Sequence, residues 1–187
     1  MARIDHEAKR ISSKVVYWGP PGSGKWTNLE LIHRRTSPPD RPPANKEQSI
    51  GFPLQLGDIR GYSTTFALLR SPNEGPMVAH VFDEIGAQPP DGIVFVVDSG
   101  PDALLANLAS LHRLVQELGA RNFDLAKLPT VFQYNKRDLA GALSVEQLRG
   151  ALNPWKHPDF EATASQGLGV FETVKQVAKQ ILAGLSR

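Results

Sequence analysis

The stretch "GPPGSGKWTN", residues 19–28, guides the interpretation of the whole chain. Up to Lys25 it has the form of a phosphate-binding loop, in which a glycine-rich turn leads from a strand into a helix. Its backbone N–H groups can converge on a phosphate at the positive end of that helix, and Lys25 adds a cation for the outer phosphates. Trp26 then stands where the motif requires Ser or Thr. The predicted phosphate-site residues are Gly19, Gly22, Ser23, Gly24, Lys25, Trp26 and Thr27.

The composition indicates one globular domain over residues 1–187, with 41% apolar and 21% charged residues. A formal net charge of +2 with scattered basic residues does not indicate a nucleic-acid partner. No run approaches the roughly 20 apolar residues of a membrane span, and the start carries no signal-peptide core. The absence of cysteine excludes disulfides and thiolate chemistry and agrees with the cytoplasmic location that we expect. The histidines have neither the spacing nor the partners for a metal site.

Short apolar runs rich in β-branched residues alternate with helical patterns, which is typical of an α/β fold with a mostly parallel central sheet. We expect about six strands with helices on both faces. The predicted strands are 14–19, 92–98, 130–135, 160–162 and a hairpin over 52–69 that turns at 57–61. The predicted helices are 25–35, 101–118, 144–152 and 170–185, and two irregular stretches cover 36–50 and 70–90.

A second motif, "NKRD" at residues 135–138, follows the apolar strand "TVFQY" and favours guanine as the bound base. The carboxylate of Asp138 can accept two hydrogen bonds from the N1–H and N2–H₂ groups of guanine, a donor pair that adenine lacks. Asn135 can tie this loop to the phosphate loop, and the stem of Lys136 can cover the base. In "TASQG", residues 163–167, the backbone N–H of Ala164 or Ser165 is placed near the guanine carbonyl, although a plain loop explains this stretch equally well.

These phrases resemble the bacterial Ras-like small GTPases of the mutual gliding protein A (MglA) type over nearly the whole chain. "GKWTN" is similar to that family's GKTTN, "PLQLGDIRG" to its PLxLGxIRG, "GIVFVVDS" to its GVVFVADS and "ASQGLGVFETVK" to its ASxGxGVFETL, and "QYNKRDL" is the same phrase. The resemblance implies a Ras-like P-loop fold and a GDP/GTP switch. It also implies a Roadblock-domain (MglB-like) partner and a role in cell polarity and gliding motility.

The departures from the family lie where a GTPase does its chemistry. Trp26 replaces the hydroxyl that coordinates Mg²⁺, and the threonine that senses the γ-phosphate aligns with Lys46, with Ser49 as the nearest hydroxyl. The family's PGQ is here Pro72-Asn73-Glu74, so the water-orienting Gln is lost, and a carboxylate near the γ-phosphate would repel it. Lys46, or Arg70 at a strand end, could supply positive charge in place of the metal.

We therefore expect a guanine nucleotide-binding switch or scaffold with weak or lost hydrolysis, no catalytic residues at the degenerate positions Asn73 and Glu74, and no protein metal ligands. Whether Mg²⁺ binds stays open. One alternative is an active MglA-type GTPase with an unusual Mg²⁺ site. Another is a nucleotide-free pseudo-GTPase scaffold in which Trp26 fills the vacated pocket.

Overall fold

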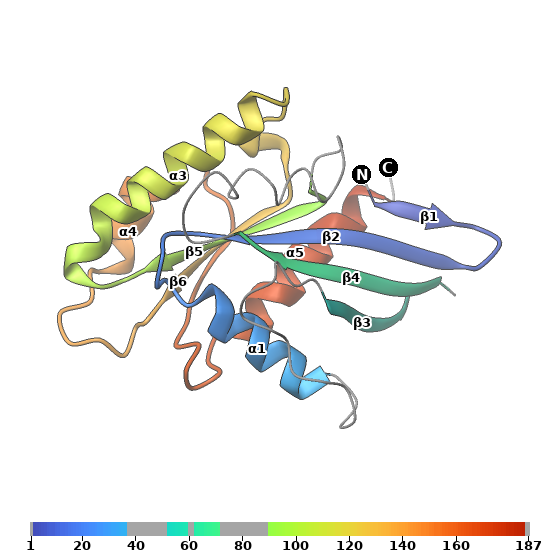
Figure 1. The fold of residues 1–187 in the computed structure, drawn as a ribbon, viewed down its shortest axis with the longest axis horizontal. Coiled ribbons are helices and arrows are strands. Elements are labelled where there is room, and N and C mark those ends of the chain that lie inside the picture. The colour runs from blue at the N-terminus through green and yellow to red at the C-terminus, as the bar shows by residue number, and fades with distance from the viewer. Residues whose placement is uncertain (1, 37–51, 60–61, 72–89, 186–187) are drawn as a thin grey trace.

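A computed structural model describes residues 2–36, 52–59, 62–71 and 90–185 (Figure 1). One seven-stranded sheet has the order β3-β4-β2-β5-β6-β7, with β1 paired to β2 outside this path. The strands are β1 (Arg3–Asp5), β2 (Arg10–Trp18), β3 (Phe52–Ile59), β4 (Tyr62–Arg70), β5 (Gly92–Asp98), β6 (Thr130–Asn135) and β7 (Asp159–Glu161). The helices are α1 (Lys25–Thr36), α3 (Leu104–Gly119), α4 (Val145–Leu152) and α5 (Val170–Gly184), with short 3₁₀ turns at Pro101–Ala103 and Leu125–Lys127.

The sheet is mostly parallel, as the alternation of strands and helices predicts. β2 pairs in parallel with both β4 and β5, and β6 pairs in parallel with β5 and β7. Among the named strands of the described ranges, the β3–β4 hairpin and the β1–β2 pair are antiparallel. Because parallel strands all end at the same edge, the loops that follow β2, β5, β6 and β7 meet there. This is the edge at which open α/β sheets bind ligands.

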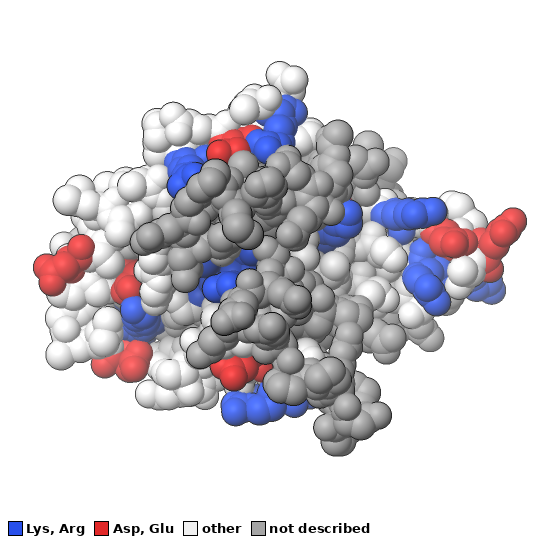
Figure 2. Space-filling model, viewed as in Figure 1, with Lys and Arg blue, Asp and Glu red and all other residues white. Residues whose placement is uncertain are grey.

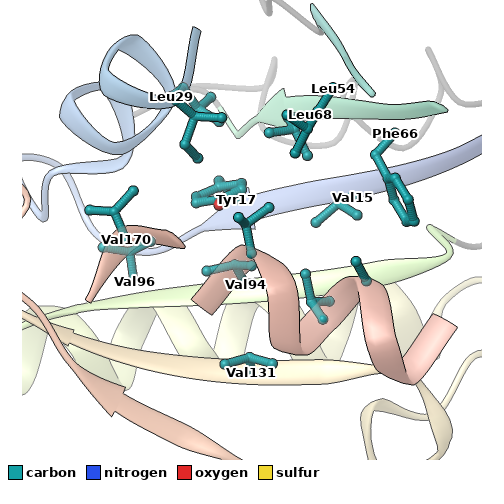
Figure 3. Packing of buried hydrophobic residues seen from close by; sticks show 14 of the residues in the cluster. Val15, Tyr17, Leu29, Leu54, Phe66, Leu68, Val94, Val96, Val131 and Val170 are labelled. Carbon is teal, nitrogen blue, oxygen red and sulfur yellow. The ribbon is translucent and has the colours of Figure 1, made fainter. Parts of the chain in front are cut away.

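The helices cover both faces of the sheet and bury its apolar strands. On one face, α1 and α5 pack over Val15 and Tyr17 of β2 and over Val94 and Val96 of β5 (Figure 3). On the other face, α3 and α4 cover the alternate residues of the same strands. Successive side chains of a strand point to opposite faces, so a strand buried on both faces is apolar at every position. This explains why "GIVFVVD" has no polar alternation.

The amino-terminal part of the sheet is larger than the sequence predicts. β2 begins at Arg10 rather than at residue 14, and β1 is an additional strand. The first half of β2 alternates exposed and buried residues and contains two serines, so it lacks the apolar run that identifies the second half. Its backbone is instead paired with β1 on one side and β4 on the other. Pairing with β1 and with the distant β4 decides its conformation, which local composition does not indicate.

The hairpin between the two irregular stretches is confirmed, but its first strand runs further than the sequence predicts. β3 continues through Gly57 and Asp58 to Ile59, and β4 starts at Tyr62. The register of β3 on β4 shifts between Gln55 and Asp58. A bulge at this point accommodates Gly57 inside the strand, where the sequence pattern had suggested a turn.

On the face seen in Figure 2, the charges of the described residues are of both signs. Figure 2 shows basic and acidic side chains close together on the described part of one face, including the end formed by β1 and the start of β2. This distribution agrees with the formal net charge of +2. None of the helices in the described ranges is long and apolar enough to cross a membrane.

Candidate functional site

The phosphate loop connects the end of β2 to the start of α1, as the sequence predicts. Gly19, Gly22 and Gly24 all have positive φ angles, a conformation that side chains disfavour. A Cβ atom at Gly19 would collide with the carbonyl oxygen of Val96, and one at Gly24 would collide with the side-chain amide of Asn135. The glycines therefore allow the loop to lie directly against the two neighbouring strand ends.

Lys25 is buried beneath this loop, with an exposed fraction of 3%. Its ammonium group donates hydrogen bonds to the carbonyl oxygens of Gly19 at 2.7 Å and Pro20 at 2.8 Å. Burial, with a smaller contribution from the nearby positive charge of Arg70, lowers the pKa of Lys25 to about 7. Because burial makes the charged form of Lys25 unfavourable, a bound anion would stabilise that charged form. The loop therefore favours a phosphate group.

Asn135 joins three loops at the carboxyl edge of the sheet. Its side-chain Nδ2 donates to the carbonyl oxygen of Ser23 at 2.7 Å, and its Oδ1 accepts from the backbone N–H of Ala164 at 2.9 Å. The first of these bonds is the tie between "NKRD" and the phosphate loop that the sequence predicts. The second also fixes "TASQG" beside them, so one buried amide sets the spacing of all three loops.

Lys136 adopts a positive φ of 63° directly after Asn135. Its ammonium group lies 2.7 Å from Oδ2 of Asp98, which ends β5. Asp98 also accepts from the backbone N–H of Gly100 at 2.9 Å. The ion pair stretches the Lys136 stem across the edge of the sheet, and the sequence patterns did not identify Asp98 as its partner.

These loops enclose a cavity of about 290 Å³, close to the lower end of the range for small-molecule sites, which is about 300–1,000 Å³. The residues that line it are Gly22, Gly24, Thr27, Asn135, Lys136, Asp138, Leu139, Ala164 and Ser165. Eight of these nine belong to the predicted site residues, and Leu139 was missed. Leu139 is apolar and yet 42% exposed. Its position directly after "NKRD" is the feature of the sequence that could have identified it as a site residue. Of the predicted set, Gly19, Ser23, Lys25 and Trp26 do not line this cavity.

A second buried polar chain lies beneath the cavity. Gln133 on β6 donates through Nε2 to Oδ1 of Asn28 at 2.9 Å and to Oγ1 of Thr173 at 3.1 Å. Asn28 in turn donates to the carbonyl oxygen of Gly24 at 2.9 Å, and the Thr173 hydroxyl donates to that of Gly169 at 2.7 Å. The chain therefore connects the phosphate loop to the segment that follows "TASQG" through fully buried side chains. Sequence reasoning missed it, because nothing local marks these three residues as partners.

Trp26 is half-buried and does not line the cavity. The guanidinium carbon of Arg70 lies 5.8 Å from the centre of its ring. The structure thus brings together the two departures, Trp26 and Arg70, that the sequence placed near the outer phosphates. The other departures, Lys46, Ser49, Asn73 and Glu74, lie outside the described residues.

The Mg²⁺ that Ras-like proteins use does not fit the described residues of this site. The indole N–H of Trp26 is a donor and cannot coordinate a cation. A guanidinium lies over the same ring, and a second cation, Lys25, is adjacent in the chain. No group of three or more His, Asp or Glu side chains that could hold a metal occurs in the described ranges.

Comparison with known proteins gives one informative match. No family model matches the chain. The chain is 38% identical to "Mutual gliding-motility protein MglA" of Myxococcus xanthus (strain DK1622) over an alignment of 195 residues, which covers 100% of this chain and 99% of that protein.

Proposed function

The chain belongs to the MglA family of Ras-like small GTPases, and from this membership we propose that it binds GDP and GTP as a regulatory switch or scaffold in cell polarity and gliding motility. Hydrolysis of GTP is weak or absent. The whole chain, residues 1–187, acts as one Ras-like domain. The name of the Myxococcus protein supports the role in gliding motility.

The observation that carries the proposal is the set of bonds made by Asn135. Because its amide fixes Ser23 and Ala164 on either side, a base bound between these loops is held in register with phosphates on the phosphate loop. Asp138 lies in the same cavity and offers a carboxylate to the N1 and N2 edge of guanine. Trp26 does not line this cavity, which supports nucleotide binding over the nucleotide-free scaffold.

Weak hydrolysis follows from the groups that should act on the γ-phosphate. In active Ras-like enzymes a metal neutralises the charge of the transferred group and a Gln orients water. Here Trp26 removes the metal ligand, and Asn73 and Glu74 replace the Gly and Gln of the family pattern. We expect turnover below the unassisted rate of Ras, about 10⁻⁴ s⁻¹, in a phosphate-release assay. Turnover at or above that rate would support the alternative, an active GTPase with an unusual metal shell.

Base selectivity tests the nucleotide site directly. Calorimetric titration of GDP, ADP and XDP into the unmutated protein should show clear preference for GDP. Asp138→Asn should weaken GDP binding by about 1.5–3 kcal/mol and shift the preference toward XDP, because one acceptor becomes a donor. Asp102→Asn, at an exposed carboxylate outside the cavity lining, is the matched control and should leave GDP binding unchanged. Equal affinity of the unmutated protein for ADP and GDP would contradict the proposed guanine nucleotide site.

A further inference from the structure

The position of Arg70 in the sheet brings its backbone next to the phosphate loop. Arg70 is the last residue of β4, and it is in register with Tyr17 of β2. The following residue, Ser71, is buried and donates its backbone N–H to the carbonyl oxygen of Tyr17 at 2.9 Å. Because Tyr17 stands only two residues before Gly19, Arg70 is held beside the first residue of the loop.

The side chain of Arg70 is oriented by Trp26. Its guanidinium lies over the indole at 5.8 Å from the ring centre, within the range of a cation–π interaction. Trp26 directly follows Lys25 at the start of α1, so the ring and the guanidinium over it lie near the helix start, the end at which anions bind. The aromatic ring of Trp26 can form a cation–π interaction with Arg70, whereas the hydroxyl of a Ser or Thr at residue 26 could not.

Lys25 and Arg70 carry like charges and lie near enough to act on each other. Burial lowers the pKa of Lys25, and the positive charge of Arg70 adds a smaller contribution in the same direction. A diphosphate between them would be attracted to both. A divalent cation brought to the same place would be repelled by both.

We propose that Arg70, held on the ring of Trp26, takes the place of the divalent cation at the phosphates, so that this protein binds guanine nucleotide without Mg²⁺. A guanidinium matches a phosphate bidentately and is always charged. Arg70 adds one positive charge to that of Lys25, which the family's GKTTN loop also carries. The inference rests on the guanine nucleotide binding proposed above and assigns the groups that hold its phosphates.

The experiment compares GDP affinity in chelator with GDP affinity in excess MgCl₂, by calorimetry on the purified full chain. In the unmutated protein the two affinities should agree within about threefold. Arg70→Gln should lose about 10- to 100-fold in chelator, the value of a hydrogen bond to a charged group. Trp26→Leu keeps an apolar side chain but removes the ring, and it should lose about two- to fivefold. Arg34→Ala, an exposed cation on α1, is the matched control and should change neither affinity.

A double variant distinguishes the proposed role of Arg70 from a general loss of folding. Trp26→Thr combined with Arg70→Asp supplies a hydroxyl and a carboxylate, both oxygen ligands that Mg²⁺ prefers, so GDP binding should become at least tenfold tighter in MgCl₂ than in chelator. A variant that merely destabilises the fold would weaken binding equally in both buffers. Circular dichroism of each variant shows whether it is folded.

The possible failures are distinguishable. If the unmutated protein binds no guanine nucleotide in either buffer, the proposed function itself is wrong. If it binds GDP tightly in MgCl₂ and more than tenfold more weakly in chelator, the function stands and this inference is overturned. If binding is independent of Mg²⁺ but Arg70→Gln binds as well as the unmutated protein, another group holds the phosphates and the assignment of Arg70 is wrong.

Discussion

Replacing Lys25 with Met should change how the stability of the nucleotide-free protein depends on pH. In the folded protein, burial and the charge of Arg70 lower the pKa of Lys25 from 10.5 to about 7. In the unfolded chain it returns to its usual value, so between pH 7 and pH 10 the unfolded chain binds more protons at this site. Stability therefore rises with pH over this window. Each pH unit within the window contributes at most about 1.4 kcal/mol.

From pH 7 to pH 10 the expected gain from Lys25 is about 3–4 kcal/mol in the free energy of unfolding. Burial also raises the pKa of Tyr17, so this tyrosine lowers stability once the unfolded chain ionises near pH 10. The window must therefore end at pH 10. Tyr17 is present in both proteins, so the difference between unmutated protein and Lys25→Met isolates the lysine.

Denaturant unfolding at pH 7, 8, 9 and 10, without nucleotide, measures this difference. The unmutated protein should gain about 3–4 kcal/mol relative to Lys25→Met across the series. Saturating GDP should remove most of the gain, because a phosphate beside the ammonium raises the pKa of Lys25 again. Parallel pH dependences of the two proteins would refute the reasoning and would mean that Lys25 keeps an ordinary pKa in the folded state.

Two further predictions concern the interior and the partner. Gln133→Leu removes the donor that joins Asn28 to Thr173, so it should lower the free energy of unfolding by about 1–3 kcal/mol and weaken GDP binding. The control Gln116→Leu, at an exposed residue, should change neither quantity. Denaturant unfolding and calorimetry measure both, and a Gln133→Leu protein with unchanged stability and GDP affinity would contradict the prediction. A Roadblock-type partner from the same genome should protect the stretches 36–50 and 70–90 from hydrogen exchange, because segments that flank the γ-phosphate signal nucleotide state in GTPases; protection of the last helix alone would argue against this surface.

The positions of the nucleotide loops were predictable because a parallel sheet brings strand ends together. Each strand between residues 92 and 135 is a short apolar run followed by a polar loop, so the sequence order alone indicates that the loop at Gly19 and the loop at Asn135 share an edge. The short strand β7 and the loop at Ala164 were also found, since they follow the same rule.

The contacts between side chains from distant strands were not predictable in the same way. The Lys136 to Asp98 ion pair and the position of Arg70 over Trp26 depend on the order and register of the strands, which periodicity does not encode. The sequence could only name Arg70 and Lys46 as possible replacements for the metal. The polar character of Gln133 alone would suggest a surface position. Its burial is explained by the buried hydrogen-bond partners that it finds in the folded protein.

The most direct test of the central claim is to identify the nucleotide that leaves the purified protein on denaturation. Protein purified without added nucleotide, then loaded with an equimolar mixture of GDP and ADP in chelator and desalted, is denatured and its supernatant is separated by ion-exchange chromatography. The account predicts close to one guanine nucleotide per chain and almost no adenine nucleotide. Release of adenine nucleotide in equal amount, or of no nucleotide at all after loading with and without MgCl₂, would contradict it.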